Sequence, residues 1–236
     1  MKIMKRKSFN ARIQELLYAK PQSQASRLVK ILNEFQAGFE FLKRHPRAIS
    51  IFGSERCGFE SEVYQEAEEL ALKLAQAGFT VITGGGHGVM EAANRGAALA
   101  KNGKSVGLVI ELPRGTHANR YIEESLSFHY FFARKTMLAF SSQAYVFFPG
   151  GFGTLDEFFE LVMLIQTRKT RPVPIVLVGR EYWQGLLKWI EETVWRSNSA
   201  ISKGDMAIYE LVDDAKGAYK MLEKKFAMEQ IKRSKA

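Results

Sequence analysis

The sequence predicts an α/β fold: a doubly wound parallel sheet with helices on both faces and helical extensions at both ends. Two observations predict it. Short apolar runs alternate along the chain with amphipathic segments of helical spacing. The apolar runs are continuous, which is typical of parallel strands covered on both faces. Right-handed crossovers between such strands build an open, doubly wound sheet.

The predicted elements follow one another without a linker, an internal repeat or a low-complexity segment. The first helix ends before Pro46, and the second ends at Gly78. We divide the chain into a basic helical extension, 1–46, and a single domain, 47–236. Helices are expected over 22–43, 61–77, 88–101, 154–169 and 181–195, within 127–142, and from about 213 to 230. Strands are expected over 47–53, 79–83, 104–112, 144–150 and 173–179.

The composition excludes several classes of protein. Of the 236 residues, 46% are apolar and 25% are charged, which is ordinary globular usage and argues against a disordered or collagen-like chain. No apolar run approaches the roughly 20 residues of a membrane-spanning helix, and the basic start lacks the apolar stretch of a secretory signal. The single cysteine, Cys57, allows no internal disulfide and no cysteine-based metal cluster. No metal site is expected, and a reducing cytoplasm is the simplest compartment.

The net charge of +9 is concentrated at the two ends of the chain. Residues 1–47 hold 11 Lys and Arg against 3 acids, and residues 216–236 hold 7 against 2. The body between them, 48–215, holds 16 against 20 and is therefore at −4. A nucleic-acid-binding domain more often carries positive charge on its folded body. Solvated terminal helices are the favoured interpretation, with nonspecific contact to nucleic acid or anionic lipid as the alternative.

Three glycine-bearing turns follow predicted strands: GSER at 53–56, GGGHG at 84–88 and PGGFGT at 149–154. In an open parallel sheet the carboxyl ends of the strands share one edge, and ligands bind in the crevice there. Glycine lets the backbone approach a ligand closely, and free N–H groups at the start of the next helix favour an anion. Three such turns predict a ligand that carries a phosphate.

The spacing of these turns differs from that of familiar nucleotide-binding loops. The chain has no GxxxxGK[ST], so a Walker-type NTPase is disfavoured. GGGHGVM lacks the full GxGxxG pattern, and no acidic residue ends the next strand at 104–110. An NAD-dependent enzyme is therefore a weak interpretation.

Two clusters of charged residues each have a structural and a functional interpretation. Thr154 and Glu157 have the spacing of a T-x-x-E capping box, with Thr154 as N-cap and Glu157 in the first turn. The alternative is that the Glu157 carboxylate faces a reacting centre beside the phosphate. Arg134 and Lys135, in FFARKTM, are either an exposed helix pair or a group that grips a phosphate.

The motifs RKTM (134–137) and PGGFGTLDE (149–157) together resemble the Lonely Guy (LOG) family of cytokinin riboside monophosphate phosphoribohydrolases. The likeness runs from about Ile49 to Asp214 and includes TGGGHGVMEAANRGA, SFHYFFARK and PIVLVGREYWQGLL. Members have often been labelled possible lysine decarboxylases. That reaction needs pyridoxal phosphate on a lysine, and the glycine turns supply no obvious residue for it.

The resemblance implies a Rossmann-like fold and hydrolysis of the N-glycosidic bond of a nucleoside 5′-monophosphate, giving a free base and ribose 5-phosphate. It implies no cofactor, and assembly as a dimer or larger homo-oligomer with the pocket near the subunit interface. Carried over to this chain, Arg134 and Glu157 are the catalytic pair. The residues expected to bind substrate are Gly53, Ser54, Gly84, Gly85, Gly86, Lys135, Gly150, Gly151, Phe152, Gly153, Thr154 and Glu160.

The chain departs from the family pattern at two places. Relatives of this longer type usually have L-P-F-E-Q where this chain has Leu112-Pro113-Arg114-Gly115-Thr116, so an acid and an amide are replaced. Relatives also often have proline at the position of His87, which is either a neutral replacement or a contact to phosphate. These departures leave the expected fold unchanged and bear on the choice of substrate and on activity.

Three functions remain open from the sequence. The first is hydrolysis of a purine nucleoside 5′-monophosphate, either AMP or a cytokinin-type nucleotide. The second is a non-catalytic module that binds or senses a nucleotide. The third is a single-strand binder of the DNA-processing type, which the negative body, 48–215, disfavours. Membrane binding is not expected.

Overall fold

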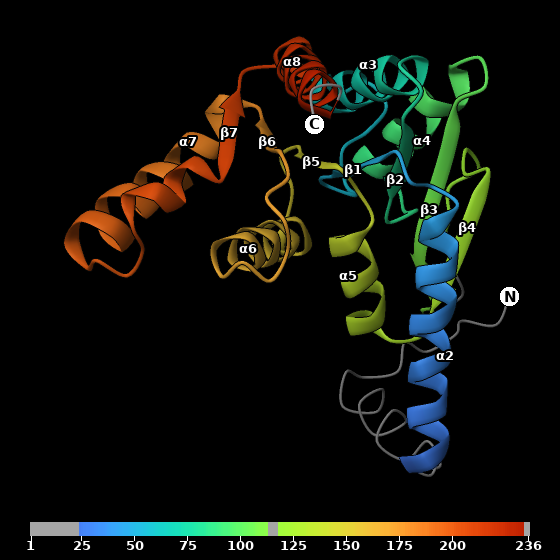
Figure 1. Ribbon diagram of the computed structural model, residues 1–236. Helices are drawn as coiled ribbons and strands as arrows, with labels where there is room; N and C mark the ends of the chain where they lie inside the picture. Colours follow the sequence, from blue (N-terminus) through green and yellow to red (C-terminus); the bar gives the residue numbers. More distant parts are fainter. Residues whose placement is uncertain (1–23, 113–117, 234–236) are drawn as a thin grey trace, which may run out of the picture.

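The computed structural model describes residues 24–112 and 118–233 of the chain. Its centre is a seven-stranded sheet in which every neighbouring pair is parallel (Figure 1). The spatial order is β4-β3-β2-β1-β5-β6-β7, so the order reverses between β1 and β5. The strands are β1 (Ala48–Phe52), β2 (Thr80–Thr83), β3 (Lys104–Ile110), β4 (Glu124–Phe128), β5 (Ala144–Phe147), β6 (Ile175–Val178) and β7 (Tyr209–Val212).

Helices cover both faces of the sheet, as the sequence predicted. One face carries α3 (Glu62–Gln76), α4 (Val89–Leu99) and α8 (Ala215–Arg233). The other carries α2 (Gln24–Lys43), α5 (Phe131–Phe140), α6 (Phe152–Gln166) and α7 (Arg180–Trp189). A π-helix, η1 (Ile190–Ser197), continues α7, and a short 3-10 helix, η2 (Lys203–Ala207), precedes β7.

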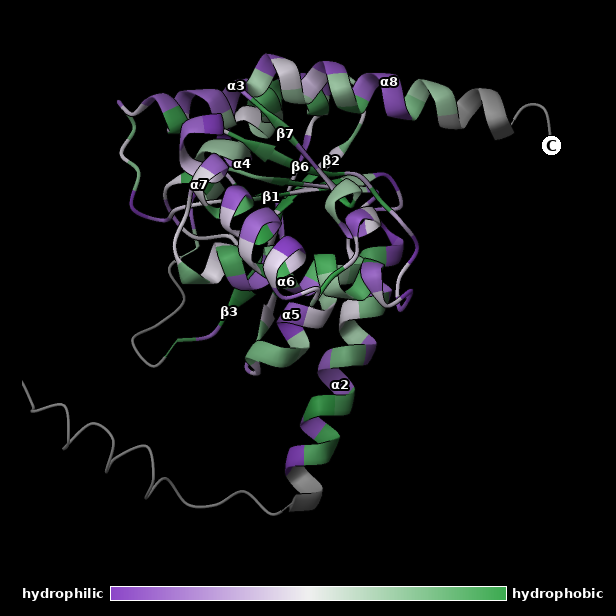
Figure 2. Cartoon of the chain, turned by 90° about the vertical axis from the view of Figure 1, so that its left-hand side faces the viewer, coloured by the Kyte–Doolittle hydropathy of each residue, from purple (hydrophilic) through white to green (hydrophobic). Residues whose placement is uncertain are grey.

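The apolar strands separate two hydrophobic cores. In β1, Ile49 and Ile51 face the helices α3 and α4, whereas Ala48 and Phe52 face the opposite layer. All residues of β1, β2, β5 and β6 are buried, which explains why their sequences are mostly apolar, with Ser50, Thr80 and Thr83 as the polar exceptions. Figure 2 shows the hydrophobic strands enclosed between helices with polar outer surfaces, and α2 extending away from this body.

Helix α3 begins and ends close to the residues that the sequence indicated. The hydroxyl of Ser61 accepts a hydrogen bond from the backbone N–H of Tyr64 at 3.3 Å and so caps the helix start. Gly78 follows the helix with a φ of 81°, a left-handed conformation that glycine adopts without strain. The predicted boundaries, 61–77, therefore agree with the helix to within a residue at each end.

Two strands were missing from the sequence prediction, and both lie at the edges of the sheet. In β4 only Phe128 is buried, and in β7 no residue is. No strand was expected at either place: the last two residues of β4 fall in the segment 127–142, which was expected to contain a helix, and residues 209–212 of β7 were given no element. The C-terminal helix begins at Ala215, two residues later than expected. The first 23 residues of the predicted extension, 1–46, lie outside the described residues.

None of the helices in the described part of the chain is both long enough and apolar enough to cross a lipid bilayer.

Candidate functional site

The three predicted glycine turns meet at the carboxyl edge of the sheet, where the strand order reverses. The backbone N–H of Ser54, after β1, donates to the carbonyl oxygen of Pro149, after β5, at 2.9 Å. The carbonyl oxygen of Ser54 accepts in turn from the N–H of Val89, the first residue of α4, at 2.9 Å. This point of reversal is the general ligand-binding crevice of open α/β sheets. The turns are therefore parts of one site rather than separate strand connections.

Close packing explains two of the glycines. A Cβ atom on Gly84 would overlap the guanidinium of Arg134, and one on Gly150 would overlap the side chain of Thr154. Gly151 and Gly153 differ from them, because a Cβ atom on either would meet nothing within 4 Å. The start of α6 is thus an open surface of bare backbone that a ligand can approach closely.

The capping box predicted at Thr154 is wrong. Helix α6 begins at Phe152, Gly151 is its N-cap, and no side chain caps it. Thr154 is therefore the third residue of the helix, where it is buried at 6% exposure, and Glu157 lies in the second turn. The first backbone N–H groups of a helix have no partner within it and attract anions. Phe152 is 92% exposed at this end of α6.

Arg134 is fixed between two strand ends rather than exposed. From α5, its Nε donates to the carbonyl oxygen of Leu108 at 2.7 Å, and its Nη2 donates to that of Gly84 at 3.2 Å. Burial lowers the pKa of the Arg134 guanidinium, and the nearby Glu157 carboxylate opposes that shift. The interpretation as an exposed helix pair is therefore wrong for Arg134. The side chain joins α5 to the glycine turn after β2.

The Glu157 carboxyl has a pKa well above that of an ordinary glutamate. Burial, and next the negative charge of Glu160, raise the pKa of the Glu157 carboxyl to about 7. The positive charges of Lys135 and Arg134 act in the opposite direction but do not cancel this effect. At neutral pH the carboxyl is thus poised between its protonated and ionised forms, which suits proton transfer.

Lys135 lies against the acidic side of α6. Its Nζ is 2.6 Å from Asp156 Oδ2 and 3.6 Å from Glu160 Oε2. The latter distance is too long for a hydrogen bond, so the buried Oε2 of Glu160 has no hydrogen-bond partner. Burial raises the pKa of Glu160. Although burial alone would lower the pKa of Lys135, its hydrogen bond to Asp156 and the neighbouring carboxylates raise it.

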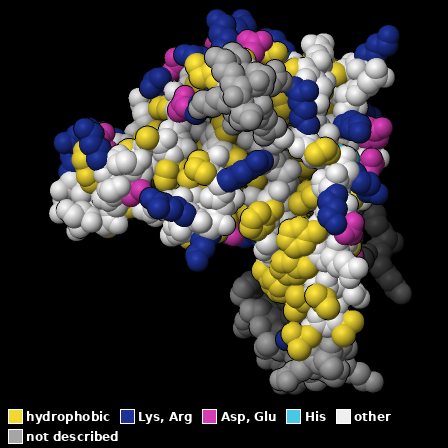
Figure 3. Space-filling view, viewed as in Figure 1, with side chains coloured by type: hydrophobic (Ala, Val, Ile, Leu, Met, Phe, Trp, Pro, Cys, Tyr) yellow, Lys and Arg dark blue, Asp and Glu magenta, His cyan; other side chains and the backbone are white. Residues whose placement is uncertain are grey.

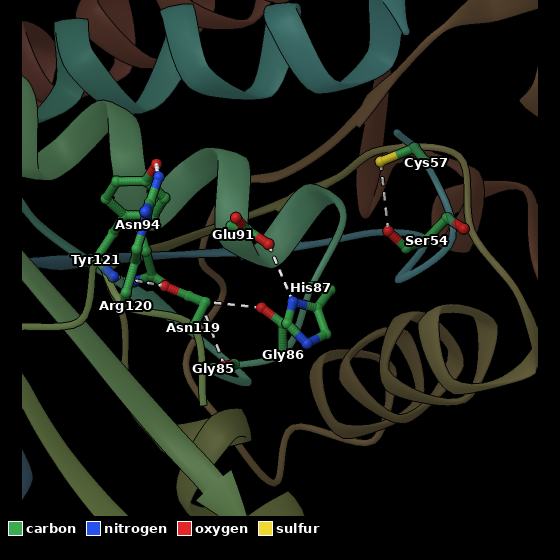
Figure 4. Close-up of polar contacts among 10 residues, drawn as sticks. All are labelled: Ser54, Cys57, Gly85, Gly86, His87, Glu91, Asn94, Asn119, Arg120 and Tyr121. Atoms are coloured by element: carbon green, nitrogen blue, oxygen red, sulfur yellow. Dashed lines mark hydrogen bonds and ion pairs between the residues drawn. The ribbon is translucent and has the colours of Figure 1, made fainter. Parts of the chain in front are cut away.

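A buried polar network that the sequence did not point to holds the turn after β2. The Nδ2 of Asn119 donates to the carbonyl oxygen of Gly86 at 2.9 Å and to Asn94 Oδ1 at 2.9 Å (Figure 4). Asn94 Oδ1 also accepts from the hydroxyl of Thr83 at 2.6 Å. A polar Asn94 on the otherwise apolar inner face of α4 is the signal that could have indicated it.

A second unpredicted contact comes from α7. The hydroxyl of Tyr182 donates to the carbonyl oxygen of Gly150 at 2.5 Å and so supports the turn after β5. His87 is directed toward α4, where its Nδ1 lies 3.0 Å from Glu91 Oε2. The substituted segment 112–116 falls almost wholly outside the described residues.

Within 24–112 and 118–233, no group of three or more His, Cys, Asp or Glu is arranged to hold a metal ion.

Comparison with solved structures supports the fold. A molybdenum cofactor carrier protein from Chlamydomonas reinhardtii superposes with a TM-score of 0.57 over 77% of this chain and 98% of the carrier, at 23% identity. A molybdenum cofactor binding protein from Rippkaea orientalis superposes with a TM-score of 0.53 over 76% of this chain and 97% of its own, at 17% identity. At such identities the likeness shows the fold alone.

Sequence comparison identifies the family. Cytokinin riboside 5′-monophosphate phosphoribohydrolases from Rhodococcoides fascians and Mycobacterium tuberculosis are 27% and 29% identical over 62% and 67% of this chain. The alignments span 75% and 84% of those relatives. A probable enzyme of that name from Oryza sativa subsp. japonica is 31% identical over 63% of this chain and 61% of its own length. The family model described as possible lysine decarboxylase matches residues 90–222, and the chain therefore belongs to this family, which is the LOG family.

Proposed function

We propose that the protein hydrolyses the N-glycosidic bond of a purine nucleoside 5′-monophosphate, AMP or a cytokinin-type nucleotide, to a free base and ribose 5-phosphate. One observation carries this proposal: Glu157, with a pKa of about 7, lies in the second turn of α6, after its uncapped start, and close enough to Arg134 for their charges to interact. An anion site, an acid–base carboxyl and a guanidinium are the groups that this reaction needs. The names of the relatives support the same activity.

The 5′-phosphate would bind at the start of α6. The unpaired N–H groups of its first turn and the positive end of its dipole attract a dianion. Gly151 and Gly153 leave room for the phosphate oxygens to reach that backbone. The Thr154 hydroxyl and the neighbouring Ser54 are further donors, with Gly53 and Gly150 forming the turns behind them. Phe152, exposed at the mouth, would bound the site.

The hydrolysis breaks the bond between C1′ of ribose and the base nitrogen, whose electron pair leaves with the base. Positive charge then builds on C1′, and the ionised Glu157 stabilises it. A water molecule adds its oxygen to C1′ and gives a proton to the Glu157 carboxylate. The protonated Glu157 carboxyl then gives this proton to the departing base nitrogen, which restores the carboxylate and leaves a neutral base and ribose 5-phosphate.

Arg134 and Lys135 would have different tasks. Arg134 uses Nε and one hydrogen of Nη2 on backbone carbonyls, which leaves N–H groups of the guanidinium for the nucleotide. Lys135 pairs with Asp156 and Glu160, and it thereby limits the negative charge that surrounds the ionised Glu157. Gly84, Gly85 and Gly86 would border the ribose or base, with Glu160 one turn behind Glu157.

A non-catalytic binding module is the second candidate, because the structural neighbours include proteins named for carrying or binding the molybdenum cofactor. Such a module needs the anion site but gives no role to a carboxyl with a raised pKa. Burying an acid next to Glu160 costs stability without improving the binding of an anion. The shifted Glu157 therefore favours hydrolysis.

We also propose that the protein assembles as a homo-oligomer. Hydrophobic side chains gather on the surface of α2 and α5 (Figure 3). Exposed apolar side chains gathered on one surface are typical of an interface between protein subunits. Its most exposed members are Leu28, Val29 and Leu32 on α2 and Phe131, Phe132 and Phe140 on α5.

The test is incubation with a panel of nucleoside 5′-monophosphates, with chromatography to detect the free base. Wild type should release a purine from AMP or an N6-substituted AMP and act little on the unphosphorylated nucleoside. Glu157→Gln keeps the shape but removes the charge, so kcat should fall by about a hundredfold or more while AMP still binds. A variant with near-normal kcat would contradict the role of Glu157, and equal rates on adenosine and AMP would contradict the phosphate site.

A further inference from the structure

A cavity of about 450 Å³ lies beside the glycine turn after β2, and neither Arg134 nor Glu157 lines it. Its walls come from the loop after β1, the starts of α3 and α4, and the segment before β4. It therefore opens on the face covered by α3 and α4, whereas Arg134 and Glu157 lie on the helices of the other face. Its volume is in the range of sites for small organic ligands. The proposed function gives it no role.

Flat groups dominate two parts of its wall. The guanidinium of Arg95 lies 4.7 Å from the ring centre of Phe59, and that of Arg120 lies 5.0 Å from the ring centre of Tyr121. Phe59 is 54% exposed although it is a large apolar residue. Rings and guanidinium planes are the surfaces on which proteins stack flat heterocycles.

The charges in the wall are largely balanced. Arg95 forms an ion pair of 2.6 Å with Glu68, and Arg120 donates from Nη2 to the hydroxyl of Tyr121 at 2.8 Å. Two acidic side chains, Glu55 and Glu91, line the same cavity. A phosphate would meet these carboxylates without an excess of positive charge, and an organic cation would meet two guanidinium groups. The ligand that suits such a wall has no net charge.

Hydrogen-bonding groups stand at the edge of these flat surfaces. Figure 4 shows Glu91 directed toward His87, with Arg120 and Tyr121 on one side of it and Cys57 on the other. A carboxylate accepts from the exocyclic amino group of a base, and a guanidinium donates to ring nitrogen or carbonyl oxygen. The wall therefore offers both an acceptor and a donor to the edge of a stacked ring.

We propose that this cavity binds an uncharged planar heterocycle, a purine base or its nucleoside without phosphate, stacked against Phe59 and Tyr121 and held at its edge by Glu91 and Arg120. It is a second site, separate from the crevice between β1 and β5. The negative body, 48–215, argues against a nucleic acid strand as the source of the base.

The experiment measures adenine and adenosine binding to the full chain by calorimetry, with ribose 5-phosphate in excess to fill the crevice. Wild type should bind with a Kd of about 1 mM or tighter. Phe59→Ala should weaken binding by about tenfold or more, the effect of losing a stacking partner. Arg120→Ala should weaken it by about threefold to tenfold, through one hydrogen bond. Trp189→Ala, which removes an aromatic side chain of similar exposure, 53%, from α7, is the matched control and should bind as wild type.

Three results would overturn this assignment: no binding in the millimolar range, equal binding by Phe59→Ala and wild type, or an oligonucleotide that binds through Phe59 while adenine does not.

Hydrolysis is measured on the same variants. Phe59→Ala should keep the AMP turnover of wild type, and a loss of turnover that matches the loss of adenine binding would place the substrate base here and refute a separate site. Binding of adenine by a protein that hydrolyses nothing would sustain the cavity and refute the proposed function instead.

Discussion

The guanidinium of Arg134 donates a hydrogen bond to the carbonyl oxygen of Gly84, 3.2 Å away, and a side chain at position 84 would occupy the place of that guanidinium. The side chain on α5 and the turn after β2 are thus fitted to each other. The turn positions Arg134, and any side chain at position 84 would have to displace the Arg134 guanidinium.

Gly84→Ala should therefore displace Arg134 without unfolding the protein. We expect kcat/KM for the nucleotide to fall by about tenfold to a hundredfold, because misplacing a positioned group by an ångström has an effect of this order. Gly185→Ala is the control, since a Cβ atom there meets nothing within 4 Å and alanine favours the helix α7. Unchanged kinetics in Gly84→Ala would show that Arg134 is not needed in its observed position.

Tyr182 should affect substrate binding more than chemistry. Its hydroxyl supports the carbonyl oxygen of Gly150, at the turn that leads to the proposed phosphate site. Tyr182→Phe removes this hydrogen bond, which is partly exposed to solvent, so KM should rise by about twofold to fivefold with kcat little changed. Steady-state kinetics separate the two parameters. A drop in kcat at constant KM would contradict a supporting role for this hydroxyl.

Oligomerisation should depend on the exposed apolar surface of α2. Light scattering at micromolar concentration should give at least twice the mass of one chain. Leu32→Glu places a charge within the hydrophobic patch and should weaken association by about a hundredfold or more, because a buried charge is costly. Asn33→Glu adds the same charge at a neighbouring exposed polar position and should assemble as wild type. A wild-type protein that is monomeric in this measurement excludes the interface.

The sequence was informative wherever local chemistry alone determines structure. Largely apolar runs located β1, β2, β3, β5 and β6, because strands buried on both faces take few polar residues. Buried polar exceptions such as Ser50, Thr83 and Ser105 form hydrogen bonds with other side chains. The edge strands β4 and β7 escaped prediction since one side of each is solvated and their residues stay partly exposed. The π-helical turn at Ile190–Ser197 has no signature in the sequence that we could identify.

The sequence predicted which glycine turns form the candidate site, but it did not predict the hydrogen bonds between its side chains and the backbone. Glycine turns after strands necessarily share the sheet edge in this fold, so their meeting follows from topology. The partners of Arg134 are backbone carbonyl oxygens of Leu108 and Gly84, which no residue pattern encodes. The T-x-x-E spacing at Thr154 was misleading because the same residues fit a cap or the interior of a helix that starts two residues earlier.

The pH dependence of hydrolysis should reflect Glu157. If the ionised carboxylate is the active form, kcat/KM should rise as pH increases through about 7, rather than near the ordinary value of a glutamate. Glu160→Gln removes a negative charge that raises the pKa of Glu157, so the rising limb should move to lower pH. Glu62→Gln, at the start of α3, controls for the loss of a carboxylate elsewhere and should leave the profile in place. A profile unchanged by Glu160→Gln would show that another group titrates.

Glu157 should also make folding stability depend on pH. Its folded-state pKa, about 7, lies above the unfolded value near 4.5, so the folded protein favours the protonated form. This contribution is fully present below pH 4.5 and is lost as pH rises from 4.5 through 7. Glu157→Gln, which stays neutral, should nearly match wild type at and below pH 4.5 and exceed it by about 3 kcal/mol at pH 8. Thermal unfolding of both proteins at the two pH values tests this, and a variant that is less stable than wild type at pH 8 would show that the buried carboxylate stabilises the fold.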